Sequence, residues 1–427
     1  MKVKDVLLEQ KKELSLRLQS QYIPRSVEIK NPDSNLIKII IGPRRAGKSF
    51  FVMRYLLDTV PFGYVNFDDE QLTDPEKIPD ILTAINDIYA GSRTILMDEI
   101  QNISGWELLV NRLARQGYNL FITGSNAHLL SKELATHLTG RHSVTTIFPF
   151  SFQEFLQMKN KDLTEAEYRE SLEEYSLTGG FPEPLLAFID KKDYLIRLFD
   201  AIIYKDIIRR YNIGYPQGLG DLAHYLCSTI SNEYSVHSLT KISGCKSDKT
   251  VKKYLDYLEQ TFLFFSVPRF SFKFKEQVSS HKKIYCIDNG FITAKGFSSS
   301  RNSGRLLENI VAVSLKKDEL SGLINFYYWK NAQQEEIDFV VRVYHKIIAL
   351  VQVCTKMDDT NTKEREVRAL LKGAHDLKCS NLVMLTMYEE GEQQEEWFGY
   401  SGVIRYIPLW KWLLLPAHEK LGYSLSS

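Results

Sequence analysis

The sequence predicts an α/β protein in which a parallel-sheet core is followed by a helical subdomain, a winged helix and a second α/β domain. Residues 36–150 alternate short apolar runs with helical stretches, a pattern typical of parallel strands joined by helical crossovers. Residues 151–275 are mostly helical and end in an aromatic, strand-like stretch, and strands return after residue 282. Because 427 residues exceed the usual size of one hydrophobic core, we expect two or three domains.

The order of these patterns sets approximate boundaries along the chain. We expect an N-terminal helix (1–30), a core (31–155), a helical subdomain (156–220), a winged helix (221–277) and a C-terminal α/β domain (278–427).

The first segment, MKVKDVLLEQKKELSLRLQS, mixes charged and apolar residues and lacks the uninterrupted apolar stretch of a signal peptide. It predicts an amphipathic helix. No run in the chain approaches the roughly 18 apolar residues that a membrane-spanning helix needs. We therefore expect a soluble protein without a membrane partner.

Composition limits the classes of partner and compartment. Lys and Arg number 54 and Asp and Glu 53, for a net charge of +1, so a nucleic-acid surface would have to be a local patch. The five cysteines are scattered singly, without the close pairs of a zinc site or the density of a secreted scaffold. A cytosolic location is expected.

The stretch LIKIIIGPRRAGKSFF, residues 36–51, combines an apolar strand, a glycine-rich loop and the start of a helix. It matches the phosphate-binding pattern G-x-x-x-x-G-K-[ST] in the context that this pattern requires. In such a loop, backbone N–H groups surround a β-phosphate, the lysine reaches the β and γ oxygens, and the hydroxyl ligates Mg²⁺. The prediction is a P-loop fold that binds ATP and Mg²⁺. The expected nucleotide contacts are Gly42, Pro43, Arg44, Arg45, Ala46, Gly47, Lys48, Ser49 and Phe50.

The stretch TILMDEIQN supplies two acids at the end of another apolar strand. Asp98 is placed to hold Mg²⁺ together with Ser49, and Glu99 is placed to activate the attacking water. Two helix-capping acids after a core strand are the alternative interpretation. The pair favours hydrolysis over binding alone.

A third strand, in LFITGSNAHLL, ends in polar residues. Ser125 and Asn126 could sense the γ-phosphate through the attacking water, if this strand lies beside the P-loop. An ordinary strand-to-helix turn with a Ser or Asn cap explains them equally well.

Five stretches, in this order and spacing, carry a family resemblance: GPRRAGKS, ILMDEIQN, FITGSNAHLL, LTGRHSVTTIFPFSFQEFL and LTGGFPEPLL. The chain resembles the AAA+-like prokaryotic ATPases that have a C-terminal domain of unknown function. The resemblance implies a P-loop ATPase core, a helical and winged-helix middle and a restriction-endonuclease-like C-terminal fold. It also implies that Arg141 serves as an arginine finger or sensor, in cis or from a neighbouring subunit. A surface arginine paired with a carboxylate is the alternative.

The predicted recognition helix, in SDKTVKKYLDYLEQ, carries lysines along its early turns, and further lysines lie nearby. Lysines suit salt-dependent phosphate contacts, although acids dilute the patch and this helix has no arginine to read guanine edges. A structural spacer or a protein-docking surface is the alternative. The lysines are Lys241, Lys246, Lys249, Lys252, Lys253, Lys273 and Lys275.

A restriction-endonuclease-like core needs a helix Glu, an Asp on a central strand and E-x-K on the next strand. Glu308 and Asp338 fit the first two positions, but Gln352 and Cys354 replace the Glu and Lys of the third motif. A neutral amide and a thiol should bind metal and activate water poorly. Lys356, two residues further on, could substitute in part. We expect a nuclease-like remnant used for binding or assembly, with nuclease activity lost.

We therefore expect a Mg²⁺-dependent ATPase that rearranges its winged-helix and C-terminal domains, on nucleic acid. The catalytic residues would be Glu99, Lys48 and Arg141. Two alternatives stay open, which are an ATP-gated nuclease and a signalling or assembly switch that binds proteins. The sequence does not specify the oligomeric state, and a homo-oligomer is among the candidates.

Overall fold

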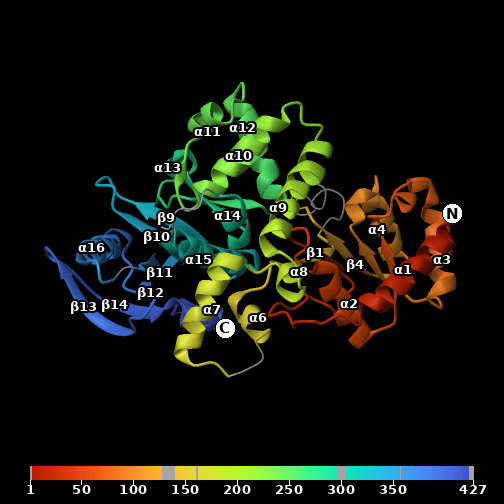
Figure 1. Ribbon diagram of the computed structural model, residues 1–427, viewed down its shortest axis with the longest axis horizontal. Helices are drawn as coiled ribbons and strands as arrows, with labels where there is room; N and C mark the ends of the chain where they lie inside the picture. Colours follow the sequence, from red (N-terminus) through yellow and green to blue (C-terminus); the bar gives the residue numbers. More distant parts are fainter. Residues whose placement is uncertain (1, 127–139, 160–161, 297–302, 356, 423–427) are drawn as a thin grey trace. The chain divides into compact units, whose positions relative to one another are not determined.

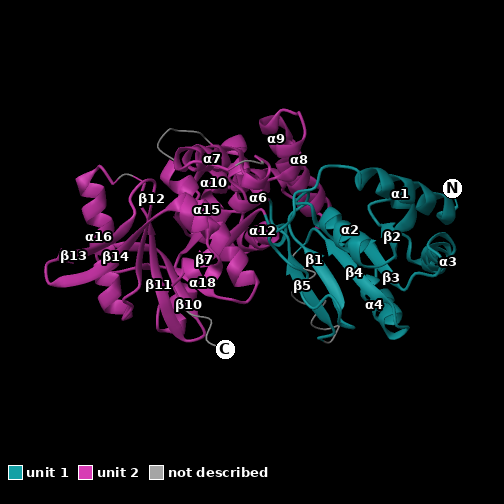
Figure 2. Ribbon diagram, turned by 90° about the horizontal axis from the view of Figure 1, so that it is seen from below, with its two compact units in different colours: residues 1–149, 260–262 teal, residues 150–259, 263–427 magenta. Residues whose placement is uncertain are grey.

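The computed structural model describes residues 2–126, 140–159, 162–296, 303–355 and 357–422. Its contacts divide the chain into two compact units (Figure 2). Unit 1 comprises residues 1–149 and 260–262, and unit 2 comprises residues 150–259 and 263–427.

Unit 1 is built on a five-stranded parallel sheet of order β2-β3-β4-β1-β5. Every residue of β1 and β3 is buried, as expected for central strands that are covered on both faces. The strands are β1 (Ile37–Ile41), β2 (Phe62–Asn66), β3 (Thr94–Asp98), β4 (Asn119–Gly124) and β5 (His142–Thr146). The helices are α1 (Val3–Arg17), α2 (Lys48–Thr59), α3 (Ile78–Ile88) and α4 (Trp106–Arg115).

Helices cover the two faces of this sheet (Figure 1). Ile37, Ile39 and Ile41 of β1 pack in one core cluster with α1, α3 and α4. Ile40 points to the other face and packs with α2. The predicted N-terminal helix is therefore present as α1, and it belongs to the core of unit 1.

Unit 2 begins with helices and a small antiparallel sheet of order β6-β8-β7. Its first elements are α6 (Phe152–Gln157), α7 (Glu165–Thr178), α8 (Pro182–Leu186), α9 (Lys191–Ala201), a π-helical continuation (Ile202–Arg209) and α10 (Pro216–Ser228). They are followed by β6 (Glu233–Tyr234), α11 (Val236–Ile242), α12 (Asp248–Gln260), β7 (Phe264–Pro268), α13 (Phe274–Ser279), β8 (Lys282–Cys286) and α14 (Asn289–Lys295).

The stretch LTGGFPEPLL, one of the five that carry the family resemblance, contacts Asp288, the N-cap of α14. Its carboxylate accepts hydrogen bonds from the backbone N–H groups of Gly180 (2.7 Å) and Gly290 (2.8 Å). A Cβ on Gly179 would lie 1.8 Å from this carboxylate, so a glycine at position 179 is required for the approach. Burial raises the pKa of Asp288 to about 7, although both backbone hydrogen bonds oppose the shift.

The C-terminal part of unit 2 is a six-stranded sheet between two long helices. Leu307 and Val311 of α15 pack on one face, and Leu370 and Leu371 of α16 pack on the other. The sheet order is β13-β14-β12-β11-β10-β9, with parallel pairing only at β11–β12 and β12–β14 among the strands described. The elements are α15 (Ser303–Leu320), β9 (Asn325–Lys330), β10 (Glu336–Val343), β11 (Lys346–Val353), α16 (Thr360–Leu377), β12 (Leu382–Thr386), β13 (Gly391–Trp397), β14 (Tyr400–Pro408), α17 (Leu409–Leu414) and α18 (Ala417–Lys420).

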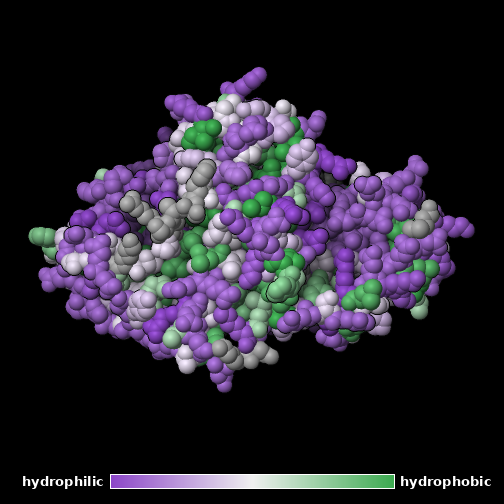
Figure 3. Space-filling view, in the orientation of Figure 1, coloured by the Kyte–Doolittle hydropathy of each residue, from purple (hydrophilic) through white to green (hydrophobic). Residues whose placement is uncertain are grey.

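The predicted fold class is confirmed at this level, with a parallel-sheet core and a separate C-terminal sheet domain. The finer division into five segments stays a prediction. The face visible in Figure 3 is mostly hydrophilic, with apolar residues in small groups. Throughout the described ranges, no helix is both long and apolar enough to cross a bilayer.

Candidate active site

The loop between β1 and α2 has a backbone that requires its glycines. Gly42 has φ +147°, and a Cβ there would lie 1.9 Å from the carbonyl oxygen of Ile147. Gly47, the N-cap of α2, has φ +91°. Both conformations strongly disfavour residues with a Cβ. The two glycines of the motif are therefore required by the backbone conformation of the loop as well as by phosphate binding.

Lys48 is almost completely buried, with 4% of its surface exposed. Its Nζ donates a hydrogen bond to the carbonyl of Pro43 (3.0 Å) and lies 3.9 Å from Oε1 of Glu99. The ammonium is thus held inside its own loop, at the N-terminus of α2. This is the location at which a P-loop lysine meets the β- and γ-phosphates.

Asp98, the last residue of β3, accepts hydrogen bonds from three hydroxyl groups. Ser49 Oγ donates to Oδ1 at 2.6 Å, the Tyr64 hydroxyl donates to Oδ2 at 3.1 Å, and Thr123 Oγ1 also donates to Oδ1. Burial raises the pKa of Asp98 and the adjacent Glu99 raises it further, whereas the bonds from Ser49 and Thr123 lower it. A hydroxyl beside a carboxylate offers the oxygen ligands that Mg²⁺ prefers, so these residues fit the ion.

Glu99 is held in a left-handed backbone conformation, with φ +52°. Its Oε2 accepts hydrogen bonds from Ser125 Oγ (3.1 Å) and from Gln101 Nε2. Burial by itself would raise the pKa of Glu99, but the Lys48 ammonium and the Gln101 hydrogen bond outweigh burial and lower it. The carboxylate is therefore ionised at neutral pH, as a base that accepts a proton from water must be.

Residues at the end of β4 contact both Asp98 and Glu99. Thr123 Oγ1 donates to Asp98 and accepts a hydrogen bond from the backbone N–H of Glu99 at 3.1 Å. Ser125 contacts the Glu99 carboxylate, and Asn126 is buried beside it in sequence, with 4% of its surface exposed. The three strand ends that the sequence pointed to are thus brought together, and Ser125 touches the acid expected to be the base.

Arg141 lies away from this group. It precedes β5, and its carbonyl accepts a hydrogen bond from the N–H of Ile37 at the start of β1 (3.0 Å). The P-loop follows the opposite end of β1, and a five-residue strand spans about 16 Å. In this arrangement Arg141 does not reach the P-loop of its own chain, so the role in cis does not fit. A role across subunits stays a prediction.

The sequence did not identify three residues that support the site. Arg25 Nη1 donates to the carbonyl of Ala46 within the P-loop (2.9 Å). Tyr64 and Gln101 contact the two acids, as described above. Gln101 had a local signal, because it follows Glu99 by two residues. Arg25 and Tyr64 had none, since only the folded chain brings them to the loop and to β3.

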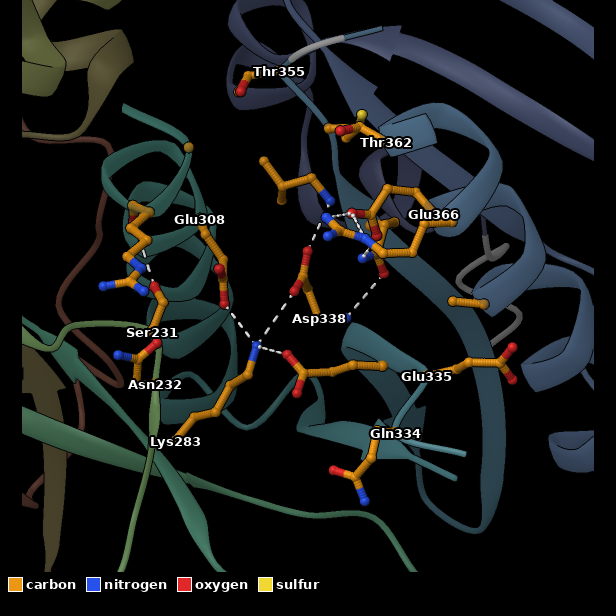
Figure 4. Close-up of a pocket in the computed structure, with 18 of the residues that line it drawn as sticks. Ser231, Asn232, Lys283, Glu308, Gln334, Glu335, Asp338, Thr355, Thr362 and Glu366 are labelled. Atoms are coloured by element: carbon orange, nitrogen blue, oxygen red, sulfur yellow. Dashed lines mark hydrogen bonds and ion pairs between the residues drawn. The ribbon is translucent and has the colours of Figure 1, made fainter. Parts of the chain in front are cut away.

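The nuclease-like residues also come together, in unit 2. Glu308 of α15, Asp338 of β10 and Gln352 of β11 line one cavity of about 550 Å³ (Figure 4). Gln352 Oε1 accepts a hydrogen bond from the Asp338 N–H (3.1 Å), and Nε2 donates to Glu366. Cys354 is buried. Lys356 lies outside the described residues.

A residue that the sequence did not suggest lies at the centre of these acids. Lys283 of β8 places Nζ 3.0 Å from Glu308 Oε1, 2.6 Å from Glu336 Oε1 and 3.3 Å from Asp338 Oδ1 (Figure 4). Burial opposes its charge, but the surrounding carboxylates raise the pKa of Lys283 well above its ordinary value. The ammonium is therefore charged and fully paired.

The lysines predicted to contact nucleic acid lie on exposed surface. Lys249, Lys252 and Lys253 are exposed on α12, as are Lys241 and Lys246 before it. Lys273 and Lys275 are exposed in the segment that joins β7 to β8.

The glycine loop, the Ser49–Asp98 pair and the parallel sheet define an AAA-type P-loop ATPase domain. A family model described as an AAA domain matches residues 34–156. Two models described as domains of unknown function match residues 169–301 (DUF8612) and 303–412 (DUF4143). The resemblance to AAA ATPases with a C-terminal domain of unknown function is confirmed at this level.

The chain belongs to the family of the uncharacterized protein MJ1544 of Methanocaldococcus jannaschii, with 34% identity over 426 residues that cover 94% of this chain and 93% of that protein. An uncharacterized protein of Haemophilus influenzae is 31% identical over 362 residues, which cover 81% of this chain and 88% of its own length. Among solved structures, the Walker-type ATPase PABY2304 of Pyrococcus abyssi is 15% identical, with a TM-score of 0.42 over 61% of this chain and 91% of that chain.

Proposed function

We propose that the protein hydrolyses ATP in a Mg²⁺-dependent reaction. The observation that carries the proposal is the pairing of Ser49 with Asp98 at 2.6 Å, directly beside a Glu99 carboxylate that is held by its own hydrogen bonds. A protein that only bound nucleotide would need the first pair alone. The positioned second acid supports hydrolysis.

Each residue has a distinct part in this proposal. The backbone N–H groups of residues 42–49 and the Lys48 ammonium bind the β- and γ-phosphates. Ser49 and Asp98 would hold Mg²⁺, which neutralises charge on the phosphate oxygens when it is bound. Glu99 orients the attacking water and accepts its proton at the carboxylate. Arg141 would approach the γ-phosphate of a neighbouring subunit, which requires a homo-oligomer.

Two substitutions test the proposal. Lys48→Ala should abolish binding of a fluorescent ATP analogue, whereas Glu99→Gln should retain binding and lower phosphate release by about 10²- to 10⁴-fold. Glu70→Gln is the matched control, because Glu70 is an exposed acid of the same unit. Normal turnover by Glu99→Gln would show that another group is the base.

We propose further that residues 216–286 form a winged helix that binds nucleic acid. The order α10, β6, α11, α12, β7, α13 and β8 supports the fold, and the exposed lysines of α12 support the ligand. The segment between β7 and β8 adds two exposed aromatic residues, Phe272 (73% exposed) and Phe274 (79%), between and beside Lys273 and Lys275. Aromatic side chains next to cations suit stacking on bases.

Binding of DNA measured against salt tests this second proposal. The affinity should fall steeply with salt, and Lys252→Ala with Lys253→Ala should reduce the slope of log K against log salt by about 2. The control is Lys192→Ala, because Lys192 is an exposed lysine of α9, outside residues 216–286. A slope near zero would favour the alternative of an ATP-dependent switch that binds proteins.

We propose that the C-terminal sheet domain has a restriction-endonuclease-like fold that does not cut. The meeting of Glu308, Asp338 and position 352 at one cavity supports the fold. Gln352 and Cys354 support the loss of activity. All five cysteines are free and buried, which supports a reducing, cytosolic setting. Cleavage of plasmid by the wild type with Mg²⁺ or Mn²⁺, lost in Asp338→Ala, would overturn this proposal and favour an ATP-gated nuclease.

A further inference from the structure

We propose that the acidic cluster of the C-terminal domain takes its cation from the chain itself. The Lys283 ammonium stands among the carboxylates where a nuclease-like fold would hold a divalent metal, and the cluster therefore binds no metal ion. We call Lys283, Glu308, Glu336 and Asp338 the lysine cluster. The inference does not depend on ATP hydrolysis, since the cluster lies wholly within unit 2.

The geometry of the ammonium supports this assignment. A lysine ammonium has three hydrogens to donate. Here three carboxylates surround it, with Nζ···O distances of 2.6, 3.0 and 3.3 Å. Only 3% of the Lys283 side chain is exposed, so water does not compete for these hydrogens. A metal ion at this position would have to displace a buried cation that already has all its partners.

The oxygens of the cluster are also engaged elsewhere. The Tyr285 hydroxyl donates to Glu308 Oε1 at 2.7 Å, from two residues along the same strand as Lys283. Asp338 Oδ2 accepts the backbone N–H of Val353 at 3.0 Å. These bonds fix the carboxylates in the orientation that faces the ammonium.

Gln352 does not restore a metal ligand. Its carbonyl oxygen is bound by the Asp338 N–H, and its amide nitrogen is bound to Glu366. A carboxylate at this position would bring a further negative charge toward Asp338, whereas the amide brings none. The glutamine at position 352 and the presence of Lys283 therefore both disfavour the binding of a metal ion. Within the described ranges, no group of three or more His, Cys, Asp or Glu side chains is arranged to hold a metal ion.

Lys283 belongs to a different part of unit 2 from its acidic partners, which gives the lysine cluster a structural role. β8 belongs to the sheet β6-β8-β7, while Glu308 and Asp338 belong to the C-terminal sheet domain and its helix. The ammonium therefore joins two parts of unit 2 through a buried ionic contact. Removing one partner from such a contact is strongly destabilising, because it leaves the other charges buried and unpaired.

Manganese binding to the nucleotide-free protein tests the proposal. The wild type and the double variant Glu308→Gln/Asp338→Asn should bind the same number of Mn²⁺ ions by electron paramagnetic resonance. Lys283→Met removes the cation that three carboxylates share, so it should gain one Mn²⁺ site. Its unfolding temperature should be about 10 °C below that of the wild type and should recover by several degrees in about 1 mM Mn²⁺.

Lys282→Met is the matched control, because Lys282 is the exposed neighbour on the same strand. It should show neither change. Loss of one Mn²⁺ from the wild type on Glu308→Gln/Asp338→Asn substitution would overturn the proposal, as would a Lys283→Met variant of wild-type stability that binds no extra ion. If Lys283→Met does not fold, the comparison of the wild type with the double variant decides alone.

Discussion

The hydroxyl of Thr123 is predicted to fix the positions of Asp98 and Glu99 relative to each other, and Thr123→Val removes this hydroxyl with little change in shape. The side chain is completely buried. The substitution deletes a hydrogen bond to the Asp98 carboxylate and leaves the Glu99 N–H, which lay 3.1 Å from the hydroxyl, without that acceptor. A bond to a charged group contributes about 2 kcal/mol, and a buried unpaired N–H costs about 1 kcal/mol or more. We expect the free energy of unfolding to fall by about 3 kcal/mol.

The effect on catalysis should be separate from the effect on stability. Glu99 has a positive φ, a conformation that persists only where its surroundings enforce it. Without the bond to its N–H, the carboxylate should shift, and a misplacement of about 1 Å can cost roughly 10²-fold in rate. We expect kcat to fall by about 10- to 100-fold, while the KM for ATP changes little because the P-loop is intact.

Urea unfolding and phosphate-release kinetics would measure the two effects. Thr145→Val is the matched control, since Thr145 is a buried threonine of β5 whose hydroxyl accepts one backbone N–H, from Lys30 (3.0 Å). It should lose stability and keep its turnover. Wild-type kcat in Thr123→Val would refute the reasoning, because the hydroxyl would then have no part in positioning Glu99.

Three further predictions follow from single contacts. Gly42→Ala should lower ATP affinity by about 10²-fold or more, because its Cβ would lie 1.9 Å from a carbonyl oxygen. Gly91→Ala is the control, because Gly91 also has a positive φ but faces open space, and it should leave ATP binding unchanged. Equilibrium titration with an ATP analogue would compare the two variants. Ser125→Ala should lower kcat by about 10-fold without changing ATP affinity, since the hydroxyl is hydrogen-bonded to Glu99 and Gln101. Equal losses in affinity and turnover would contradict this. Asp288 has a folded pKa of about 7, above its unfolded value near 3.8, so the native state binds the extra proton and stability is lost as the pH rises through 7. Between pH 6 and pH 8 the free energy of unfolding should fall by about 1.4 kcal/mol from this group, and urea titrations of Asp288→Asn should lack that contribution.

The sequence alone was sufficient to predict those site residues that are close neighbours along the chain. The P-loop is a contiguous stretch, and Asp98 and Glu99 end an apolar strand, so position along the chain and position in the site agree. Ser125 required one further step, because carboxyl ends of parallel strands meet at one edge of a sheet. The three apolar stretches that the sequence marked as strands in unit 1 are present as β1, β3 and β4.

Other parts of the fold and the site had no local signal. The segment HSVTT forms β5 although only one of its residues is strongly apolar, because pairing with β1 supplies its hydrogen bonds. Arg25 reaches the P-loop through tertiary packing. Lys283 is separated from Glu308 by 25 residues and from Asp338 by 55, and nothing in the sequence KKIYC distinguishes it from its exposed neighbour. Burial and pairing decide its role, and both are properties of the folded chain.

The two outer strands of the six-stranded sheet have different protection against pairing with strands of other molecules. Beside β9, the segment after β7 runs along the outer edge, where the Phe270 N–H donates to the Tyr328 carbonyl (2.6 Å) and occupies it. At the other end, β13 leaves its backbone edge uncovered by any described strand, but its sequence GEQQEEW is mostly exposed and acidic. Like charges repel a second copy of the same edge. The charge of β13 therefore disfavours extension of the sheet by a strand from another molecule at high protein concentration, although the backbone edge of β13 is open to pairing.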